Sequence, residues 1–249
     1  MKFTVLNYDT IESTNTEALN QAKLGADEGL CVAARQQTGG RGRHGRMWLS
    51  PKDSGLYMSV VLRPKLDMRY IPLITLAAGV AVYEVLADLG IDADIKWVND
   101  VLVDGRKICG ILGETADTNL GLAVILGIGI NVTNSSFPPV IADKATAIIS
   151  HSAEKIAPSD LIEPLTRQLD NFYQILLSQN GVQSIIDEWA KRSTYFKGKH
   201  VKVVLEAGVV RGITDGLEPS GALRVITDDG KVRIIQAGEL ELLRVAEAV

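Results

Sequence analysis

The feature that most constrains this chain is an uninterrupted apolar run over residues 122–132, LAVILGIGINV. A strand with one face in water alternates between apolar and polar residues, whereas this run shows no such alternation. We therefore expect a strand that is buried on both faces. The composition supports a core of that kind, because 46% of the 249 residues are hydrophobic and 22% are charged, which excludes a disordered or fibrous chain.

A second apolar stretch, residues 71–83, predicts a buried core helix rather than a membrane span. It contains Pro72 and Thr75 and ends at Glu84, so it is shorter than the roughly 20 residues that cross a bilayer. The first residues, MKFTVLNYD, have no basic start followed by an apolar run, so they do not resemble a secretory signal. We expect a soluble protein of the cytoplasm.

Charge and cysteine usage exclude several kinds of site. The formal charge is −4, from 26 basic and 30 acidic side chains, which argues against general coating of nucleic acid. Cys31 and Cys109 stand alone among apolar neighbours, so we expect buried thiols, in keeping with a reducing cytosol. The three histidines are scattered and do not form a zinc-ligand spacing; they are His44, His151 and His200.

The rest of the first 196 residues predicts alternating strands and helices. Thr14 followed by Glu17 forms a capping box, and Ser159 is placed to cap a later helix. The dipeptide Asp104-Gly105 predicts a hairpin turn. Predicted helices cover residues 14–24, 71–89, 181–192 and a segment after Ser159 with Leu161, Leu165, Leu169, Phe172 and Leu176 facing inward; predicted strands cover residues 30–35, 56–62, 93–97, 101–103, 107–115 and 122–132.

The pattern changes after Gly198. Short β-rich runs at 200–206, 209–214, 222–226 and 231–236 are separated by Asp215-Gly216, Ser220-Gly221 and Asp229-Gly230. Runs of this length and spacing predict a small barrel. We place a domain boundary near residue 196, which gives one domain over residues 1–196 and a second over residues 197–249.

A glycine- and arginine-rich segment over residues 37–46 is the most informative motif. Glycine lets the backbone approach a ligand closely, and arginine presents a planar fork that suits phosphate or carboxylate oxygens. The segment favours a flexible loop that closes over an anion. A solvated basic loop is the alternative, and the motif is neither a P-loop nor a dinucleotide fingerprint.

Three further segments carry polar residues next to apolar runs. Residues 96–100, KWVND, are followed by Lys107, which enters a buried strand at a cost unless it meets an anion. Snorkelling and a plain turn are the alternative interpretations of Lys96 and Asn99-Asp100. Residues 13–15, STN, suit a helix cap, and residues 127–131, GIGIN, offer small residues and an amide at a strand end.

Together and in this order, these segments resemble the biotin–protein ligases. The family pattern has Ser-Thr-Asn, then Gln-x-x-Gly-Arg-Gly-Arg-x-Gly-Arg, Lys-Trp-Pro-Asn-Asp, a lysine seven residues later and Gly-x-Gly-Ile-Asn. The chain matches at residues 13–15, 37–46, 96–100, Lys107 and 127–131. Val98 replaces the usual proline, which loosens the loop but removes no functional group. The motifs cover residues 7–132, and the β-rich end matches more loosely.

The resemblance implies an α+β fold: a catalytic domain similar to class II aminoacyl-tRNA synthetases, with a mixed sheet flanked by helices, and a small SH3-like β-barrel. It implies a ligase that uses ATP, biotin and Mg²⁺. The biotin carboxylate attacks the α-phosphate of ATP to give biotinyl-5′-AMP and pyrophosphate. A lysine of a biotin carboxyl carrier protein domain then attacks the mixed anhydride. The resemblance also allows a homodimer.

The same resemblance assigns roles residue by residue. It implies catalytic roles for Arg43 and Lys107, and no metal ligand is firmly assigned. Contacts with biotin or its adenylate are implied for Ser13, Thr14, Asn15, Gln37, Arg41, Gly42, Arg43 and Lys107. The ATP and Mg²⁺ side is implied for Arg46, Asn99, Asp100 and Asn131.

Three alternative functions are open at this point. Lipoate or octanoyl transfer occurs on the related fold, although the Gly-Arg-Gly-Arg loop favours biotin. A biotin-sensing DNA-binding repressor would need an N-terminal helix-turn-helix, and the Ser-Thr-Asn at residue 13 leaves no room for it, so we expect no DNA binding. A carrier-binding module without catalysis would bind the acceptor domain but release no pyrophosphate.

Overall fold

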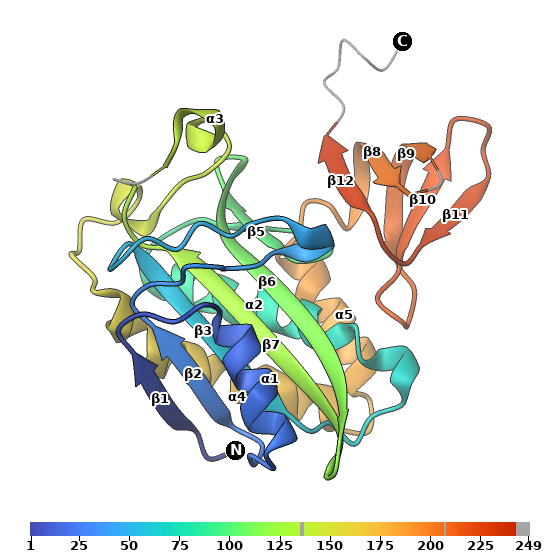
Figure 1. Cartoon of the computed structure of the whole chain (residues 1–249). Helices are drawn as coiled ribbons and strands as arrows, with labels where there is room; N and C mark the ends of the chain where they lie inside the picture. Colours follow the sequence, from blue (N-terminus) through green and yellow to red (C-terminus); the bar gives the residue numbers. More distant parts are fainter. Residues whose placement is uncertain (135–136, 207, 243–249) are drawn as a thin grey trace.

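The computed structural model of the chain describes residues 1–134, 137–206 and 208–242 (Figure 1). Its larger sheet has seven strands in the order β1-β2-β3-β7-β6-β5-β4. Neighbouring strands are antiparallel except β1 and β2, so the sheet is mixed. The strands are β1 (Thr4–Tyr8), β2 (Leu30–Ala34), β3 (Gly55–Leu62), β4 (Asp94–Lys96), β5 (Asp100–Val103), β6 (Arg106–Thr118) and β7 (Gly121–Asn131).

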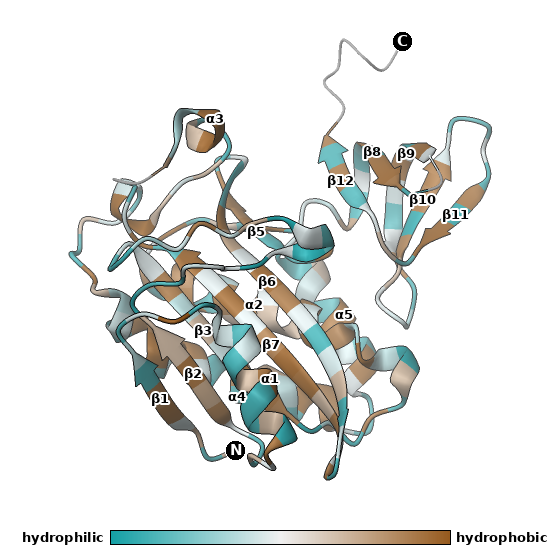
Figure 2. Cartoon of the chain, viewed as in Figure 1, coloured by the Kyte–Doolittle hydropathy of each residue, from teal (hydrophilic) through white to brown (hydrophobic). Residues whose placement is uncertain are grey.

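The apolar run over residues 122–132 forms β7, the middle strand of this sheet. Residues 123–128 are all buried, so the expectation of a strand covered on both faces is confirmed. The neighbouring β3 is buried along its whole length, and Figure 2 shows apolar residues concentrated on these central strands. The hairpin predicted at Asp104-Gly105 is also confirmed, because both residues adopt positive φ angles of 51° and 71° between β5 and β6.

Helices cover the two faces of the sheet unequally (Figure 1). On one face, α2 (Leu73–Asp88) packs against β6 and against α4 (Ile162–Leu177) and α5 (Gly181–Lys191). On the other face, α1 (Thr14–Lys23) lies over β2, β3 and β7. The shorter helical segments are α3 (Pro139–Ala142) and the 3₁₀ turns Arg43–Gly45, Met68–Tyr70, Ile148–Ser150 and Pro158–Leu161.

The segment Met68–Asp88 has 21 residues, and the mean hydropathy of its most apolar 18-residue window is 1.7, which is enough length and apolar character to cross a membrane. The apolar helical segment therefore extends beyond residues 71–83 and is long enough to span a bilayer, so length by itself does not exclude a membrane span. Nevertheless, 67% of its most apolar window is buried inside the protein, where α2 packs on α4, α5 and β6. The prediction of a core helix is confirmed by this packing.

Three local predictions are wrong. Ser13 rather than Thr14 is the N-cap of α1, because the Thr14 hydroxyl is engaged by Gln37. The Ser159 side chain caps no helix; this residue lies inside a 3₁₀ turn, and α4 follows it. Asp215-Gly216 lies within a strand instead of ending one. The edge strand β1 and the last described strand of the chain were not predicted.

A second, antiparallel sheet follows α5, in the order β11-β10-β9-β8-β12. Its inward residues continue the main hydrophobic core. The indole N–H of Trp97, which follows β4, donates to the carbonyl of Gly221 at 3.0 Å and so connects the end of β4 to the segment between β9 and β10. The division near residue 196 lies between α5 and β8 and stays a prediction; residues 243–249 lie outside the described residues. The strands are β8 (Lys197–Leu205), β9 (Gly208–Leu217), β10 (Leu223–Thr227), β11 (Val232–Ile235) and β12 (Glu239–Leu242).

Candidate active site

The start of α1 is held beside the strand-to-loop segment after β2. Backbone N–H groups of Thr38 and Gly39 donate to the carbonyls of Ile11 and Glu12 at 2.9 and 2.8 Å. This pairing brings Gln37 next to the first turn of α1, where the Thr14 backbone N–H donates to Gln37 Oε1 at 2.8 Å. The start of α1 and the glycine-rich loop belong to separate sequence motifs, and these hydrogen bonds join them into one wall of the site.

Glycines of β6 and β7 make room on the sheet for two side chains. A Cβ on Gly127 would lie 2.1 Å from Asn15 Oδ1, and a Cβ on Gly129 would lie 2.5 Å from the Trp48 ring. Gly110, the cross-strand partner of Gly129, has the same ring 2.9 Å from its hypothetical Cβ. No other residue type fits at these positions without moving Asn15 or Trp48.

The three arginines of the loop bind different partners. Arg41 donates to the Glu114 carboxylate at 3.1 Å, and Arg43 donates to Asn99 Oδ1 at 3.3 Å and to the Gly238 carbonyl at 3.4 Å. Arg46 forms a two-bonded ion pair with Glu239 at the start of β12. The loop is thus connected to α1's end of the site through Arg41 and to the second sheet through Arg43 and Arg46.

The start of β5 supplies one of the two carboxylates of the cavity, Asp100. Asp100 lies 2.5 Å from the Lys107 ammonium and 3.9 Å from the Lys96 ammonium. Lys107 Nζ also lies 5.4 Å from the centre of the Trp48 ring. The peptide bond between Trp97 and Val98 is cis. The anion that the sequence analysis required for Lys107 is therefore present within the chain.

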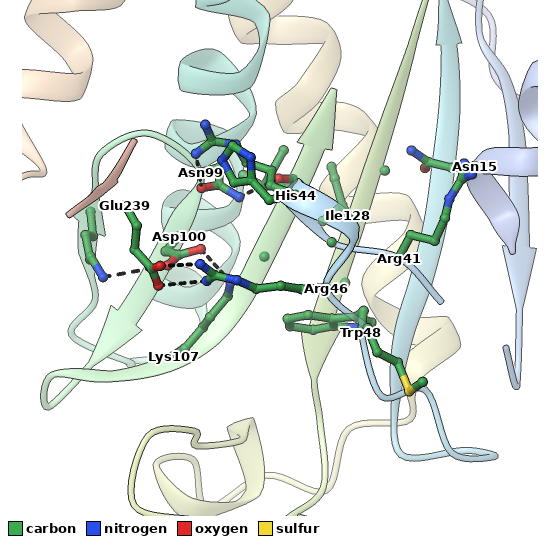
Figure 3. A pocket seen from close by; sticks show the side chains of 18 of the residues that line it. Asn15, Arg41, His44, Arg46, Trp48, Asn99, Asp100, Lys107, Ile128 and Glu239 are labelled. Atoms are coloured by element: carbon green, nitrogen blue, oxygen red, sulfur yellow. Dashed lines mark hydrogen bonds and ion pairs between the residues drawn. The ribbon is translucent and has the colours of Figure 1, made fainter. Parts of the chain in front are cut away.

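These elements enclose a cavity of about 150 Å³. Figure 3 shows Asn15 and Arg41 at one end and Asp100, Lys107, Arg46 and Glu239 at the other, with Trp48 between them. Every residue for which a site role was predicted lines this cavity except Asn131; those present are Ser13, Thr14, Asn15, Gln37, Arg41, Gly42, Arg43, Arg46, Asn99, Asp100 and Lys107.

Asn131 lies in an adjoining, more apolar cavity of about 240 Å³. Its amide donates to the Thr146 carbonyl at 3.0 Å and to the Lys107 carbonyl at 3.4 Å. Met47, Trp48 and Lys107 line both cavities, and the Trp48 ring and the Lys107 side chain lie at the junction between them. The remaining wall of the second cavity includes Leu49, Tyr57, Phe137, Ile141, Lys144 and Ala145.

The first cavity has an excess of positive charge. Burial lowers the pKa of the Arg43 guanidinium, although an arginine stays protonated at any physiological pH. The ion pair with Arg46 lowers the pKa of Glu239, so this carboxyl stays ionised near neutral pH. Five cations face two carboxylates here, which favours binding of an anion. The five cations are Arg41, Arg43, Arg46, Lys96 and Lys107.

No group of three or more His, Cys, Asp or Glu side chains within the described ranges could hold a metal ion by itself. Magnesium often uses one or two carboxylates together with the phosphates of a nucleotide. Asp100 is the carboxylate next to Lys107, with 20% of its side chain exposed, and could supply one such ligand. The donor set fits a magnesium ion that arrives with a nucleotide.

Several lining residues were missed from the sequence. Trp48 stands next to the recognised loop, and only its position in the fold shows that it lies at the junction of two cavities. Its indole N–H is buried without a hydrogen-bond partner among the described residues. Glu239 and the Gly238 carbonyl come from the second sheet, about 190 positions after the loop, and no local signal marks them.

Comparisons with known proteins agree with this geometry. Residues 8–131 match the model of the biotin/lipoate A/B protein ligase family, and residues 196–243 match the biotin protein ligase C terminal domain. The chain is 35% identical over 238 residues to a bifunctional ligase/repressor BirA of Bacillus spizizenii, covering 94% of this chain and 72% of that protein. It is 32% identical to a biotin–[acetyl-CoA-carboxylase] ligase of Mycobacterium tuberculosis, covering 93% and 86%.

A solved structure supports the same conclusion. The biotin protein ligase from Aquifex aeolicus, in complex with biotin and ATP, superimposes with a TM-score of 0.83 at 27% identity, covering 97% of this chain and 99% of that one. The resemblance seen in the sequence motifs is thereby confirmed over both sheets. This chain belongs to the biotin protein ligase family.

Proposed function

We propose that this protein activates biotin with ATP as biotinyl-5′-AMP and transfers the biotinyl group to a lysine of a biotin carboxyl carrier protein domain. The observation that supports this most directly is the pair of adjoining cavities. One has a polar end and a cationic end, the other is more apolar, and Lys107 and Trp48 line both. Such a pair suits an acid and a nucleotide whose reacting groups must meet.

The polar end of the first cavity is suited to the cyclic urea of biotin. Thr14 and Asn15 are each 4% exposed, and Gln37 lies beside them. A cyclic urea has two N–H donors and a carbonyl acceptor that would be costly to bury unpaired. We assign Ser13, Thr14, Asn15, Gln37, Arg41 and Gly42 to this part of the ligand or to the chain that follows it.

The cationic end is suited to the reacting atoms. A biotin carboxylate oxygen attacks the α-phosphorus of ATP, the new C–O–P linkage forms, and pyrophosphate leaves with the electrons of the broken P–O bond. Both reactants are anions, and Arg43 and Lys107 would offset their repulsion and the charge that develops on the phosphate. In the second step the neutral amine of the acceptor lysine attacks the carbonyl carbon, and AMP leaves.

The second cavity is suited to the nucleotide. We assign Asn131 to it, and Asn99, Asp100 and Arg46 to the phosphate side between the cavities. Magnesium held by Asp100 and the phosphates would withdraw negative charge from the phosphates. Asn99 already accepts a hydrogen bond from Arg43, so part of its role is to hold that guanidinium.

The finer structural and cellular assignments are also proposals. We propose that the larger domain is of the class II aminoacyl-tRNA synthetase type and that the five-stranded second sheet is SH3-like. We expect the protein to act in the cytoplasm on the carrier domain of a carboxylase. With a formal charge of −4, no sequence-specific DNA binding is expected, and a gel shift at low salt tests this.

The decisive experiment is ATP–pyrophosphate exchange measured with biotin, with lipoate and with neither acid. Exchange that depends on biotin supports the proposal, whereas exchange that depends on lipoate alone contradicts it. Mass spectrometry of a purified carrier domain then tests the second step, for which we expect one biotinyl group per carrier. Binding of the carrier without pyrophosphate release would instead indicate a module that lacks catalysis.

A further inference from the structure

Two residues that do not line the first cavity contact Asn15, which lies at its polar end. Ser59 on β3 has no exposed surface, and its hydroxyl lies 2.6 Å from Asn15 Oδ1. Glu114 on β6 accepts a hydrogen bond from Asn15 Nδ2 at 2.7 Å. Ser59 is the cross-strand partner of Gly127. Because Gly127 has no side chain, Asn15 fits over it, between Ser59 and Glu114.

The partners of Asn15 fix the orientation of its amide. Nδ2 lies near the Glu114 carboxylate and, at 3.4 Å, the Leu112 carbonyl, and both of these groups only accept hydrogen bonds. The amide NH₂ must therefore point toward β6 and its oxygen toward β3. Since Asn15 Oδ1 has no proton, the Ser59 hydroxyl must donate its single proton to it.

This orientation leaves the Thr14 hydroxyl with two acceptors and a single proton to donate. Gln37 Oε1 is fixed by the Thr14 backbone N–H, so it too can only accept. The Thr14 hydroxyl lies 2.7 Å from Ser59 Oγ and 3.0 Å from Gln37 Oε1. With the Ser59 proton already committed to Asn15, the one proton of Thr14 can serve only one of these two contacts. The end of the cavity is therefore short of one donor.

We propose that Ser59 and Glu114 are positioning residues that keep this end of the cavity rich in hydrogen-bond acceptors. Such an end selects a ring with N–H donors, the cyclic urea of biotin, over a ring with none, such as the dithiolane of lipoate. An N–H donated to Gln37 Oε1 releases the Thr14 proton for Ser59 and completes the network. This inference rests on the proposed function and names the residues that decide its substrate.

The primary test is Ser59→Ala, measured by steady-state adenylate formation. Without the hydroxyl, Asn15 Oδ1 and Thr14 lose a partner, so we expect the KM for biotin to rise about tenfold. The KM for ATP and the kcat at saturating biotin should stay unchanged, because Asn15 lies at the opposite end of the cavity from Lys107 (Figure 3). Desthiobiotin, which keeps the cyclic urea and lacks the sulfur, should lose affinity by the same factor.

The matched control is Thr166→Val on α4. Thr166 is 7% exposed, and its hydroxyl donates to the Glu163 carbonyl at 3.0 Å. This variant removes the hydrogen bond of a buried hydroxyl on the opposite side of the sheet. It should therefore lower the melting temperature, as Ser59→Ala does, but leave the KM values for biotin and ATP unchanged. A rise in the KM for biotin in both variants would assign the effect to general stability and overturn the proposal.

A second variant, Glu114→Gln, keeps the proposal testable if Ser59→Ala fails to fold. Glu114 has 35% of its side chain exposed, so the substitution should be tolerated. The neutral amide no longer fixes the Asn15 orientation, and the KM for biotin should again rise. Glu114→Gln also weakens the ion pair with Arg41, but that loss is the same in the single and the double variant. The double variant should therefore lose clearly less than the sum of the two single losses, because both substitutions also act through Asn15. Fully additive losses, or unchanged KM values, contradict the positioning role; a native protein that binds no biotin contradicts the proposed function instead.

Discussion

The Lys107 ammonium lies 2.5 Å from the Asp100 carboxylate. This pairing explains how a lysine enters a strand whose next residues, Ile108 and Cys109, are fully buried. The same ammonium faces the Trp48 ring at 5.4 Å, so it is held between a carboxylate and an aromatic face. An incoming carboxylate or phosphate would meet a cation that is already in place at the junction of the two cavities.

Replacing Lys107 by alanine should therefore reduce adenylate formation more than stability. Loss of a cation that stabilises the transition state commonly costs about 3 kcal/mol, or roughly a hundredfold in rate. Asp100 keeps Lys96 at 3.9 Å, so the remaining carboxylate is not left without a cation. Pyrophosphate release and thermal melting measure the two effects. Lys52→Ala, which removes an exposed ion pair with Asp9, is the control and should change neither.

Replacing Arg43 by glycine should loosen retention of the adenylate. Arg43 joins the loop to Asn99 and to the Gly238 carbonyl, and the variant loses both contacts as well as a cation. We expect released biotinyl-5′-AMP and indiscriminate biotinylation of bystander proteins, with the fold retained. Blotting of a mixed-protein reaction measures this, and labelling restricted to the carrier would contradict it.

The loop over residues 38–46 should close over the bound adenylate. Its glycines have high backbone entropy, and Arg41 and Arg46 are held by the partly exposed carboxylates of Glu114 and Glu239, from which a bound anion would draw them. Trypsin cuts after Arg41, Arg43 and Arg46, so limited digestion reports whether the loop is accessible. Biotin plus ATP should slow cleavage several-fold; equal digestion with and without them would show that the loop does not close in this way.

Adding a methyl group at Gly129 should displace Trp48 from the junction of the two cavities. The new Cβ would lie 2.5 Å from the ring, so the indole must move, and we expect adenylate formation to fall about tenfold or more. Tryptophan fluorescence should report the movement. Gly105→Ala is a suitable control, because its φ is 71° and nothing lies within 4 Å of its hypothetical Cβ. It should cost about 1 kcal/mol of stability and leave activity unchanged.

Both thiols should be unreactive in the native protein. Burial raises the pKa of Cys31 to about 12 and also raises that of Cys109, so almost no thiolate is present at pH 8. A disulfide-exchange reagent should therefore titrate no thiol in buffer and two in guanidinium chloride. Fast reaction of either cysteine in buffer would mean that the strand carrying it opens readily.

The Arg46–Glu239 ion pair should contribute to stability only above acidic pH. Its hydrogen bonds lower the pKa of Glu239 from the usual 4.5, so the contribution is complete above that value and is lost as the pH falls through the lowered folded pKa. The difference in melting temperature between the native protein and Glu239→Gln should shrink toward zero on acidification. A difference that stays constant down to pH 3 would assign the effect to packing.

Local elements followed well from sequence where burial is strong. The lack of alternation in β7 and the helical spacing of Leu165, Leu169 and Phe172 both predicted the observed burial. The edge strand β1 was missed because its residues are only partly buried, so its sequence carries little apolar pattern. Thr14 was mistaken for the cap because its true partner, Gln37, lies 23 positions away.

Local sequence patterns were enough to identify the chemical groups and their local structure: the glycine-arginine loop, the polar start of α1, and a lysine on a buried strand. They did not show which of these groups come into contact, because that depends on how the elements pack. Strand register, with its two-residue period, puts Ser59, Gly127 and Leu112 in one row under Asn15. It also places Asn131 beyond Trp48 in the second cavity, and packing of the second sheet brings Glu239 to Arg46. Contacts between distant segments of this kind leave no periodic signal in the chain, because each depends on how whole elements pack.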